Sequence, residues 1–136
     1  MWHAGDIGSS DIITELETIA PVIAVRGNVD GFPASMKLPL FESIEINQSH
    51  FLLTHRFLDH QMRPFHGIDL SIAYNYKAVI YGHTHQPKIK YHGSVLYFNP
   101  GSAAFPRHSN KPSVGVLNID KLGKIDPQIV YITKNT

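Results

Sequence analysis

The stretch Ala78-Val79-Ile80-Tyr81-Gly82-His83-Thr84-His85 decides the fold. Its four leading apolar residues predict a short strand buried on both faces, as in the parallel part of an α/β sheet. The glycine that follows lets the chain turn sharply, and two histidines come directly after it. Ligands of α/β sheets bind at the carboxyl ends of the strands. The stretch therefore places two imidazoles where a binding site is expected.

Three other polar clusters follow an apolar strand or open a loop. They are Gly5-Asp6, Gly27-Asn28-Val29-Asp30 and Thr54-His55. Each has an ordinary explanation by itself, because Gly-Asp and Gly-Asn are common turn sequences and a single histidine after a strand is more often structural. All four clusters in this order, together with Asn99-Pro100-Gly101-Ser102, favour one site built from several loops.

The remaining pattern mixes early helices with late strands. An apolar face over residues 9–20 predicts a helix capped by Ser10 and ended by Pro21. A short helix is expected at 69–76, and strands are expected at 22–25, 41–46, 51–54, 88–91, 94–98, 114–119 and 125–132, with a hairpin at His92-Gly93. No repeat or linker divides residues 1–136, which indicates one domain. The elements predict an α/β fold with a mixed sheet, or two stacked sheets, flanked by helices.

Composition excludes several classes of protein. Of the 136 residues 43% are hydrophobic and 17% are charged, which is typical of a packed core. The net charge of +1 leaves no basic footprint for nucleic acid. The absence of cysteine excludes disulfides and thiolate ligands and agrees with a cytoplasmic location. No apolar run is long enough to cross a membrane. Nine histidines leave imidazole and carboxylate as the available transition-metal ligands.

In these motifs the sequence resembles the calcineurin-like metallophosphoesterase superfamily, most closely its small single-domain phosphodiesterases and the related retromer scaffold subunit. The resemblance runs from His3-Ala4-Gly5-Asp6 to Gly115-Val116-Leu117. It implies two stacked mixed sheets flanked by helices, and a site with two divalent metal ions. Manganese is the expected metal, with iron, zinc, magnesium or nickel as alternatives. The residues that the resemblance assigns to the metals are Asp6 as the bridge, Asn28, His55 and His83 at the second ion, and His85 at the first.

Other parts of the family pattern are different or missing here. The family begins with a strand that ends in Asp-x-His, followed by a helix, and both residues of that motif bind the first metal. No such segment precedes Asp6. We expect Met1 to lie inside the second strand of a longer protein, with a natural short form as the alternative. The first site then keeps only Asp6 and His85, activity is impaired, and an exposed sheet edge favours a homo-oligomer.

Two positions near the predicted ligands have further expected roles. Asp30 is expected to orient His55 or a neighbouring ligand without binding the metal itself. Arg56 stands where the family usually has glycine, and it is expected to restrict access or to bind a phosphate of the substrate. His60 and His66 are candidates for lining the site, with ordinary loop residues as the alternative.

The expected activity is metal-dependent hydrolysis of a phosphodiester or phosphomonoester, for which the catalytic residues are Asp6, Asn28, His55 and His83. The alternative is a non-catalytic scaffold that binds a protein partner through exposed apolar residues in 57–68 or around Phe105-Pro106. A third interpretation, in which the histidines are incidental, requires that the four clusters lie apart.

Overall fold

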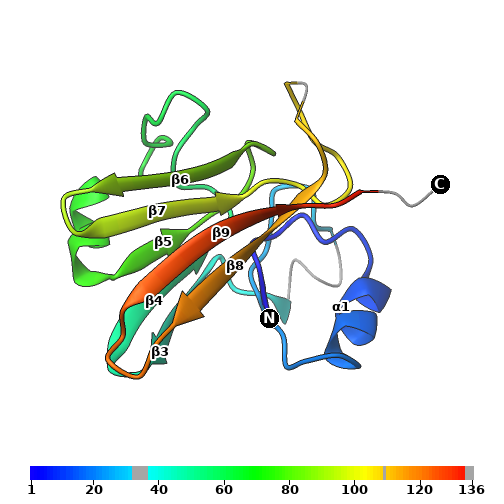
Figure 1. Cartoon of the computed structure of the whole chain (residues 1–136). Coiled ribbons are helices and arrows are strands. Elements are labelled where there is room, and N and C mark those ends of the chain that lie inside the picture. The colour runs from blue at the N-terminus through cyan, green and yellow to red at the C-terminus, as the bar shows by residue number, and fades with distance from the viewer. Residues whose placement is uncertain (32–36, 109, 134–136) are drawn as a thin grey trace.

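The computed structural model of the chain describes residues 1–31, 37–108 and 110–133. Within these residues the main sheet has the strand order β3-β4-β5-β7-β6. Strands β4, β5 and β7 run parallel, whereas β3 and β6 pair antiparallel at its two edges, so the sheet is mixed (Figure 1). The strand bounds are β3 Phe41–Ile46, β4 Ser49–Thr54, β5 Ala78–Ile80, β6 Pro87–His92 and β7 Val95–Pro100.

A second layer packs on one face of the main sheet. It consists of the parallel pair β1 (Trp2–His3) and β2 (Ile23–Ala24) and the antiparallel hairpin β8 (Ser113–Ile119) and β9 (Ile125–Tyr131). Figure 1 shows β8 and β9 lying in front of the main sheet. The core between the layers contains the buried residues Val25, Ile44, Phe51, Leu53, Ala78, Ile80, Leu96, Phe98 and Ile125. The predicted α/β fold of stacked sheets is confirmed.

The opposite face of the main sheet is covered by the segment that follows β4. Phe57 and Leu58 are each 2% exposed, and they pack with Val79 and Tyr97 in a second core. The expected short helix is a 3₁₀ helix, η1 (Leu70–Asn75), which begins after the Asp69 cap. The prediction of an exposed apolar docking surface over 57–68 is wrong for Phe57 and Leu58, because the sheet buries both of them.

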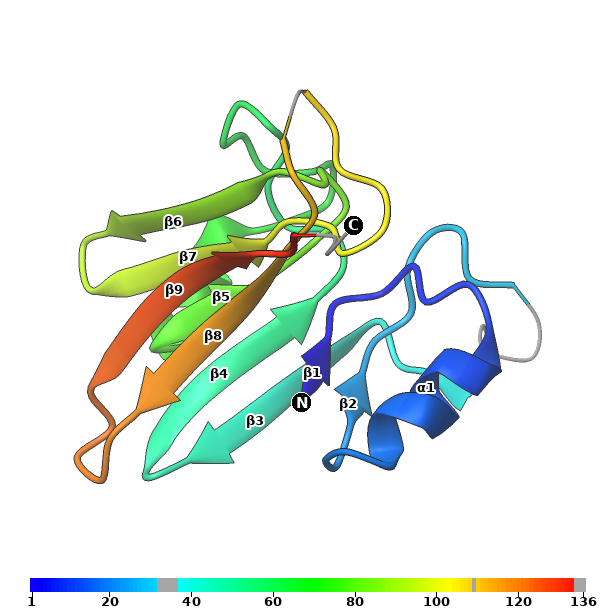
Figure 2. The same cartoon turned by 45° about the vertical axis from the view of Figure 1, so that its right-hand side comes forward.

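Helix α1 (Ser10–Glu17) is shorter than predicted, and it lies beside β2 at the side of the molecule (Figure 2). Its cap is Ser9 rather than Ser10, because the Ser9 side chain accepts a hydrogen bond from the backbone N–H of Asp11. The helix ends at Glu17 with Thr18 as its C-cap, so Pro21 is not the residue that ends it. No described helix is long and apolar enough to cross a membrane.

Candidate metal centre

The four polar clusters meet at one edge of the two layers. Asp6 follows β1, Asn28 follows β2, His55 follows β4 and His83 follows β5. Strands β1 and β2 are parallel to each other, and so are β4 and β5, so in each layer the carboxyl ends point the same way. A contact of 2.7 Å between His55 Nδ1 and the Ala4 carbonyl oxygen joins the two layers at this edge.

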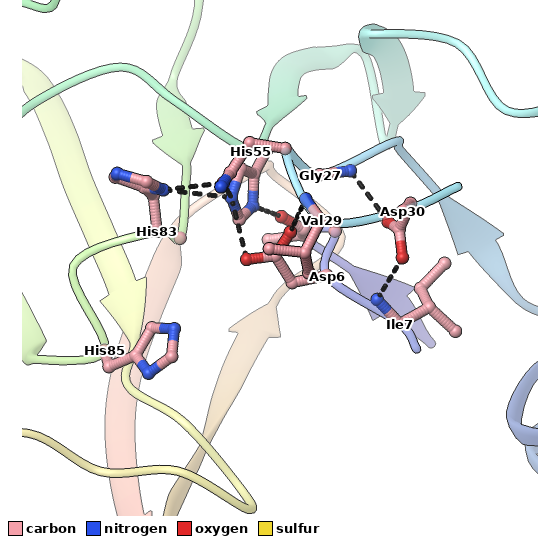
Figure 3. A network of polar contacts seen from close by, with 12 residues as sticks. Asp6, Ile7, Gly27, Val29, Asp30, His55, His83 and His85 are labelled. Atoms are coloured by element: carbon pink, nitrogen blue, oxygen red, sulfur yellow. Dashed lines mark hydrogen bonds and ion pairs between the residues drawn. The ribbon is translucent and has the colours of Figure 1, made fainter. Parts of the chain in front are cut away.

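Donor atoms from these four residues lie unusually close together. Asn28 Oδ1 is 2.7 Å from His55 Nε2 and 2.8 Å from His83 Nδ1. His55 Nε2 is also 3.2 Å from His83 Nδ1 and 3.3 Å from Asp6 Oδ2. Ligand atoms of Asp6, His55 and His83 all fall within 4.8 Å of one another. Figure 3 shows His55 between the Asp6 carboxylate and the His83 ring.

The tautomer of His55 explains why this packing suits a cation. Its Nδ1 faces the Ala4 carbonyl oxygen at 2.7 Å and therefore carries the proton in the neutral ring. Nε2 then presents a lone pair to the oxygens of Asn28 and Asp6. Lone pairs repel at this distance unless a proton or a cation lies between them. Ligands bound at about 2.1 Å to a six-coordinate ion lie about 3 Å apart, which matches the observed spacing.

Three residues of the site have an unusual backbone. Asp6, His83 and His85 have φ angles of 56°, 69° and 59°, in the left-handed region. Residues with side chains rarely adopt this conformation, and each instance costs about 1–3 kcal/mol. Such strain is maintained only where the surrounding contacts enforce it, and it is concentrated at functional sites.

Asp30 supports the loops rather than a histidine. It is 8% exposed. Its Oδ1 accepts hydrogen bonds from the N–H groups of Ile7 (2.8 Å) and Gly8 (3.2 Å), and its Oδ2 accepts one from Gly27 (2.8 Å). The carboxylate thus ties the loop after β1 to the loop after β2, and it holds the backbones of Asp6 and Asn28 in place. The Ala4 carbonyl orients His55.

His85 lies outside the tight group. Its Nδ1 is 2.6 Å from the Phe105 carbonyl oxygen, so that Nε2 is the nitrogen left free for a ligand bond. His85 is not among the residues whose ligand atoms lie within 4.8 Å of one another, although it lies in the loop that carries His83 (Figure 3).

Arg56 lies beside the donor group. Its guanidinium carbon is 5.7 Å from the centre of the Phe65 ring, and that ring meets the His83 ring edge-on at 5.1 Å. Burial lowers the pKa of His83, the neighbouring His55 and Arg56 lower it further, and the carboxylate of Asp6 acts in the opposite direction. The lowered pKa favours the neutral form of His83, which is the form that binds a metal. His60 and His66 are exposed.

Comparison with known proteins decides the family. The model of the calcineurin-like phosphoesterase superfamily domain matches residues 1–122. The chain belongs to this superfamily. A probable metallophosphoesterase from Methanothermobacter thermautotrophicus is 39% identical over 132 residues, which cover 94% of this chain and 73% of that protein. Phosphodiesterase YfcE from Escherichia coli is 33% identical over 114 residues, covering 80% of this chain and 59% of that protein.

Solved structures of the superfamily have the same fold. The crystal structure of a Vps29 single mutant from Entamoeba histolytica superposes with a TM-score of 0.70 at 26% identity, and it covers 97% of this chain and 81% of that one. The chain thus spans less than two thirds of YfcE and about four fifths of this Vps29.

Asn99 is a buried residue beside the site whose role the sequence interpretation missed. It is fully buried, and its Nδ2 donates to the Gly82 carbonyl oxygen (3.2 Å) and to Thr84 Oγ1 (3.0 Å). Its Oδ1 accepts from the N–H of Gly101 (2.9 Å). Asn99 thus fixes the loop that carries His83 and His85. The available signal was a polar residue directly after the apolar run Val95–Phe98, which predicts a buried, hydrogen-bonded side chain.

Proposed function

We propose that this chain is a single metallophosphoesterase domain that hydrolyses phosphodiesters or phosphomonoesters with divalent metal ions, manganese above all. The observation that carries the proposal is the cluster of donor atoms from Asp6, Asn28, His55 and His83, with neighbouring atoms 2.7–3.3 Å apart. The donors are nitrogen and oxygen only, a set that suits manganese, iron, zinc, nickel or magnesium.

When bound, a pair of divalent ions polarises the phosphoryl oxygens and activates the attacking water. Each residue has a separate task in that arrangement. Asp6 Oδ1 accepts the Val29 N–H (3.0 Å), which fixes the carboxylate and turns Oδ2 toward the histidines. His55 and His83 supply neutral nitrogens. Water adds its oxygen to phosphorus, the bond to the leaving oxygen breaks, and the proton of the water ends on the leaving group or in solvent.

The two metal sites are expected to differ in their affinity for the ion. In the described part of the chain, the group of Asp6, His55 and His83 is the one set of at least three acidic or histidine side chains close enough to hold an ion. His85 would hold a second ion together with Asp6 and fewer protein ligands. We therefore expect this chain to bind one ion tightly and to turn over substrate slowly.

The test is a manganese titration and a phosphodiesterase assay on the same protein. Chain stripped with EDTA is titrated with Mn²⁺ by calorimetry and then assayed on bis(p-nitrophenyl) phosphate. His83→Ala removes one donor, and His92→Ala removes an exposed histidine at the far end of β6 as a matched control. We expect wild type and His92→Ala to bind one Mn²⁺ and to release nitrophenol, and His83→Ala to lose at least about tenfold in affinity. Wild type that binds no Mn²⁺, or His83→Ala that binds as tightly, would contradict the proposal.

A non-catalytic scaffold is the second candidate function. The observation that favours it is Phe105, whose side chain is 74% exposed beside the site. Manganese binding without turnover of any phosphoester would favour the scaffold, and turnover that His83→Ala abolishes favours the enzyme.

Two further proposals concern location and assembly. We propose a cytoplasmic location, on the basis of the cysteine-free sequence. We also propose that the chain self-associates through an open sheet edge, which sedimentation velocity would test.

A further inference from the structure

Two loops form a cationic rim around the donor group. The first is residues 56–68, which follow β4, and the second is residues 101–108 together with 110 and 111, which follow β7. Together they contain Arg56, Arg63, Arg107 and Lys111 and a single acidic residue, Asp59. The rim is therefore strongly positive in a chain whose overall net charge is only +1.

Contacts place both loops at the mouth of the site. In the first loop Arg56 stacks on Phe65, and Phe65 touches His83. The second loop is anchored on both sides of Arg107, because the Phe105 carbonyl oxygen lies 2.6 Å from His85 Nδ1 and the His108 ring stacks on His60 at 6.1 Å. Arg107 is thus held between two contacts at the rim.

The arginines of the rim differ in whether their guanidinium groups form an ion pair. The carboxylate of Asp59 lies 3.0 Å from Arg63 Nε, so that charge is already paired. Among the residues that the structure describes, Arg56 and Arg107 form no ion pair. Arg56 is separated from the donors by the Phe65 ring and so stands beside the metal ligands rather than among them.

We propose that Arg56 and Arg107 bind a second anionic group of the substrate, so that the preferred substrate carries another phosphate next to the one that is cleaved. The inference rests on the proposed phosphoesterase function and names its substrate class. Guanidinium groups bind phosphate through charge-assisted, bidentate hydrogen bonds. The scissile phosphate lies at the donor group, and one aromatic ring of separation brings the arginines to a neighbouring phosphate.

Non-hydrolysable probes test the rim without any metal or turnover. The EDTA-stripped chain is titrated with methylenediphosphonate, which carries two phosphonate groups, and with methylphosphonate, which carries one. We expect the diphosphonate to bind about tenfold more tightly, because its second phosphonate adds charge-assisted contacts to the two arginines. Arg56→Gln and Arg107→Gln should each remove most of that preference, whereas Arg63→Gln, the matched control, should leave it unchanged.

Equal affinity for the two probes would overturn the inference. So would an Arg63→Gln variant that loses as much of the preference for the diphosphonate as Arg56→Gln does, because the preference would then reflect only the total charge of the rim. Turnover adds a second readout on p-nitrophenyl phosphate and p-nitrophenyl diphosphate, both of which release p-nitrophenol and which differ by one adjacent phosphate. The second ester should have the higher kcat/KM in wild type and lose this advantage in Arg56→Gln. A chain that binds no Mn²⁺ would contradict the proposed function and leave the phosphonate result to stand or fall separately.

Discussion

Gly27 lies directly against Asp6, and a Cβ atom placed on Gly27 would collide with both the carboxylate and the backbone nitrogen of Asp6. The loop after β2 therefore needs a residue without a side chain at this point. The close approach brings Asn28 beside Asp6, and it also lets Asp30 bind the N–H of Gly27. The absence of a side chain at Gly27 thus allows the two loops of the second layer to approach each other closely.

Gly27→Ala is expected to push the two loops apart and to weaken Mn²⁺ binding by at least about tenfold, since overpacking costs about 1–3 kcal/mol. Calorimetric titration measures the affinity, and circular dichroism checks that the sheets remain. Gly31→Ala is the control, because a Cβ at Gly31 meets nothing within 4 Å. Unchanged affinity in Gly27→Ala would show that the loops do not need this contact.

Asn99→Ala is expected to release the loop that carries His83 and His85. The substitution removes three hydrogen bonds and leaves the Gly82 carbonyl oxygen without its side-chain donor, which costs about 1–3 kcal/mol. Mn²⁺ affinity should fall about tenfold, as measured by calorimetry. The exposed Asn118→Ala serves as the control. An Asn99→Ala variant that is as stable as wild type and binds Mn²⁺ with the same affinity would contradict the role assigned to Asn99.

Asp30→Asn is expected to destabilise the metal-free fold. The amide keeps one acceptor oxygen but turns an NH₂ group toward a backbone donor, so charge-assisted bonds to Ile7, Gly8 or Gly27 are lost. Urea unfolding should show a loss of about 2 kcal/mol. Asp126→Asn, on the exposed face of β9, should change stability by less than about 0.5 kcal/mol. Equal stability of the two variants would exclude a supporting role for Asp30.

Stability of the metal-free chain should depend on pH through two histidines. Burial lowers the pKa of His3 and of His83 from the ordinary value of 6.5. Below pH 6.5 the unfolded chain therefore binds more protons than the folded chain, and the free energy of unfolding falls as the pH falls. Urea unfolding between neutral pH and mildly acidic pH measures this slope. His83→Gln should flatten it, and a slope that stays the same would contradict the assignment.

The sequence predicted those elements whose pattern is local. The alternating residues of β3 and the continuous apolar run of β5 mark strands because burial on one or both faces leaves a direct trace in the chain. The hairpin between β6 and β7 follows the same logic, since His92 pairs with Val95 around the predicted turn. Glycine next to a polar residue at the strand ends marked the loops of the site.

Features set by distant parts of the chain escaped the sequence interpretation. Phe57 and Leu58 lie in a segment without periodicity, and only the sheet they cover explains their burial. The link from Asn99 to Gly82 spans two strands. The choice of Ser9 over Ser10 as the helix cap depends on one side-chain contact, to which a pattern of apolar residues is insensitive.

Anomalous scattering from crystals of the chain grown with Mn²⁺ tests the metal site most directly. We expect one strong peak within about 2.1 Å of Asp6 Oδ2, Asn28 Oδ1, His55 Nε2 and His83 Nδ1. A strong peak at any other place, or clear density for these four side chains with no manganese among them, would contradict this expectation.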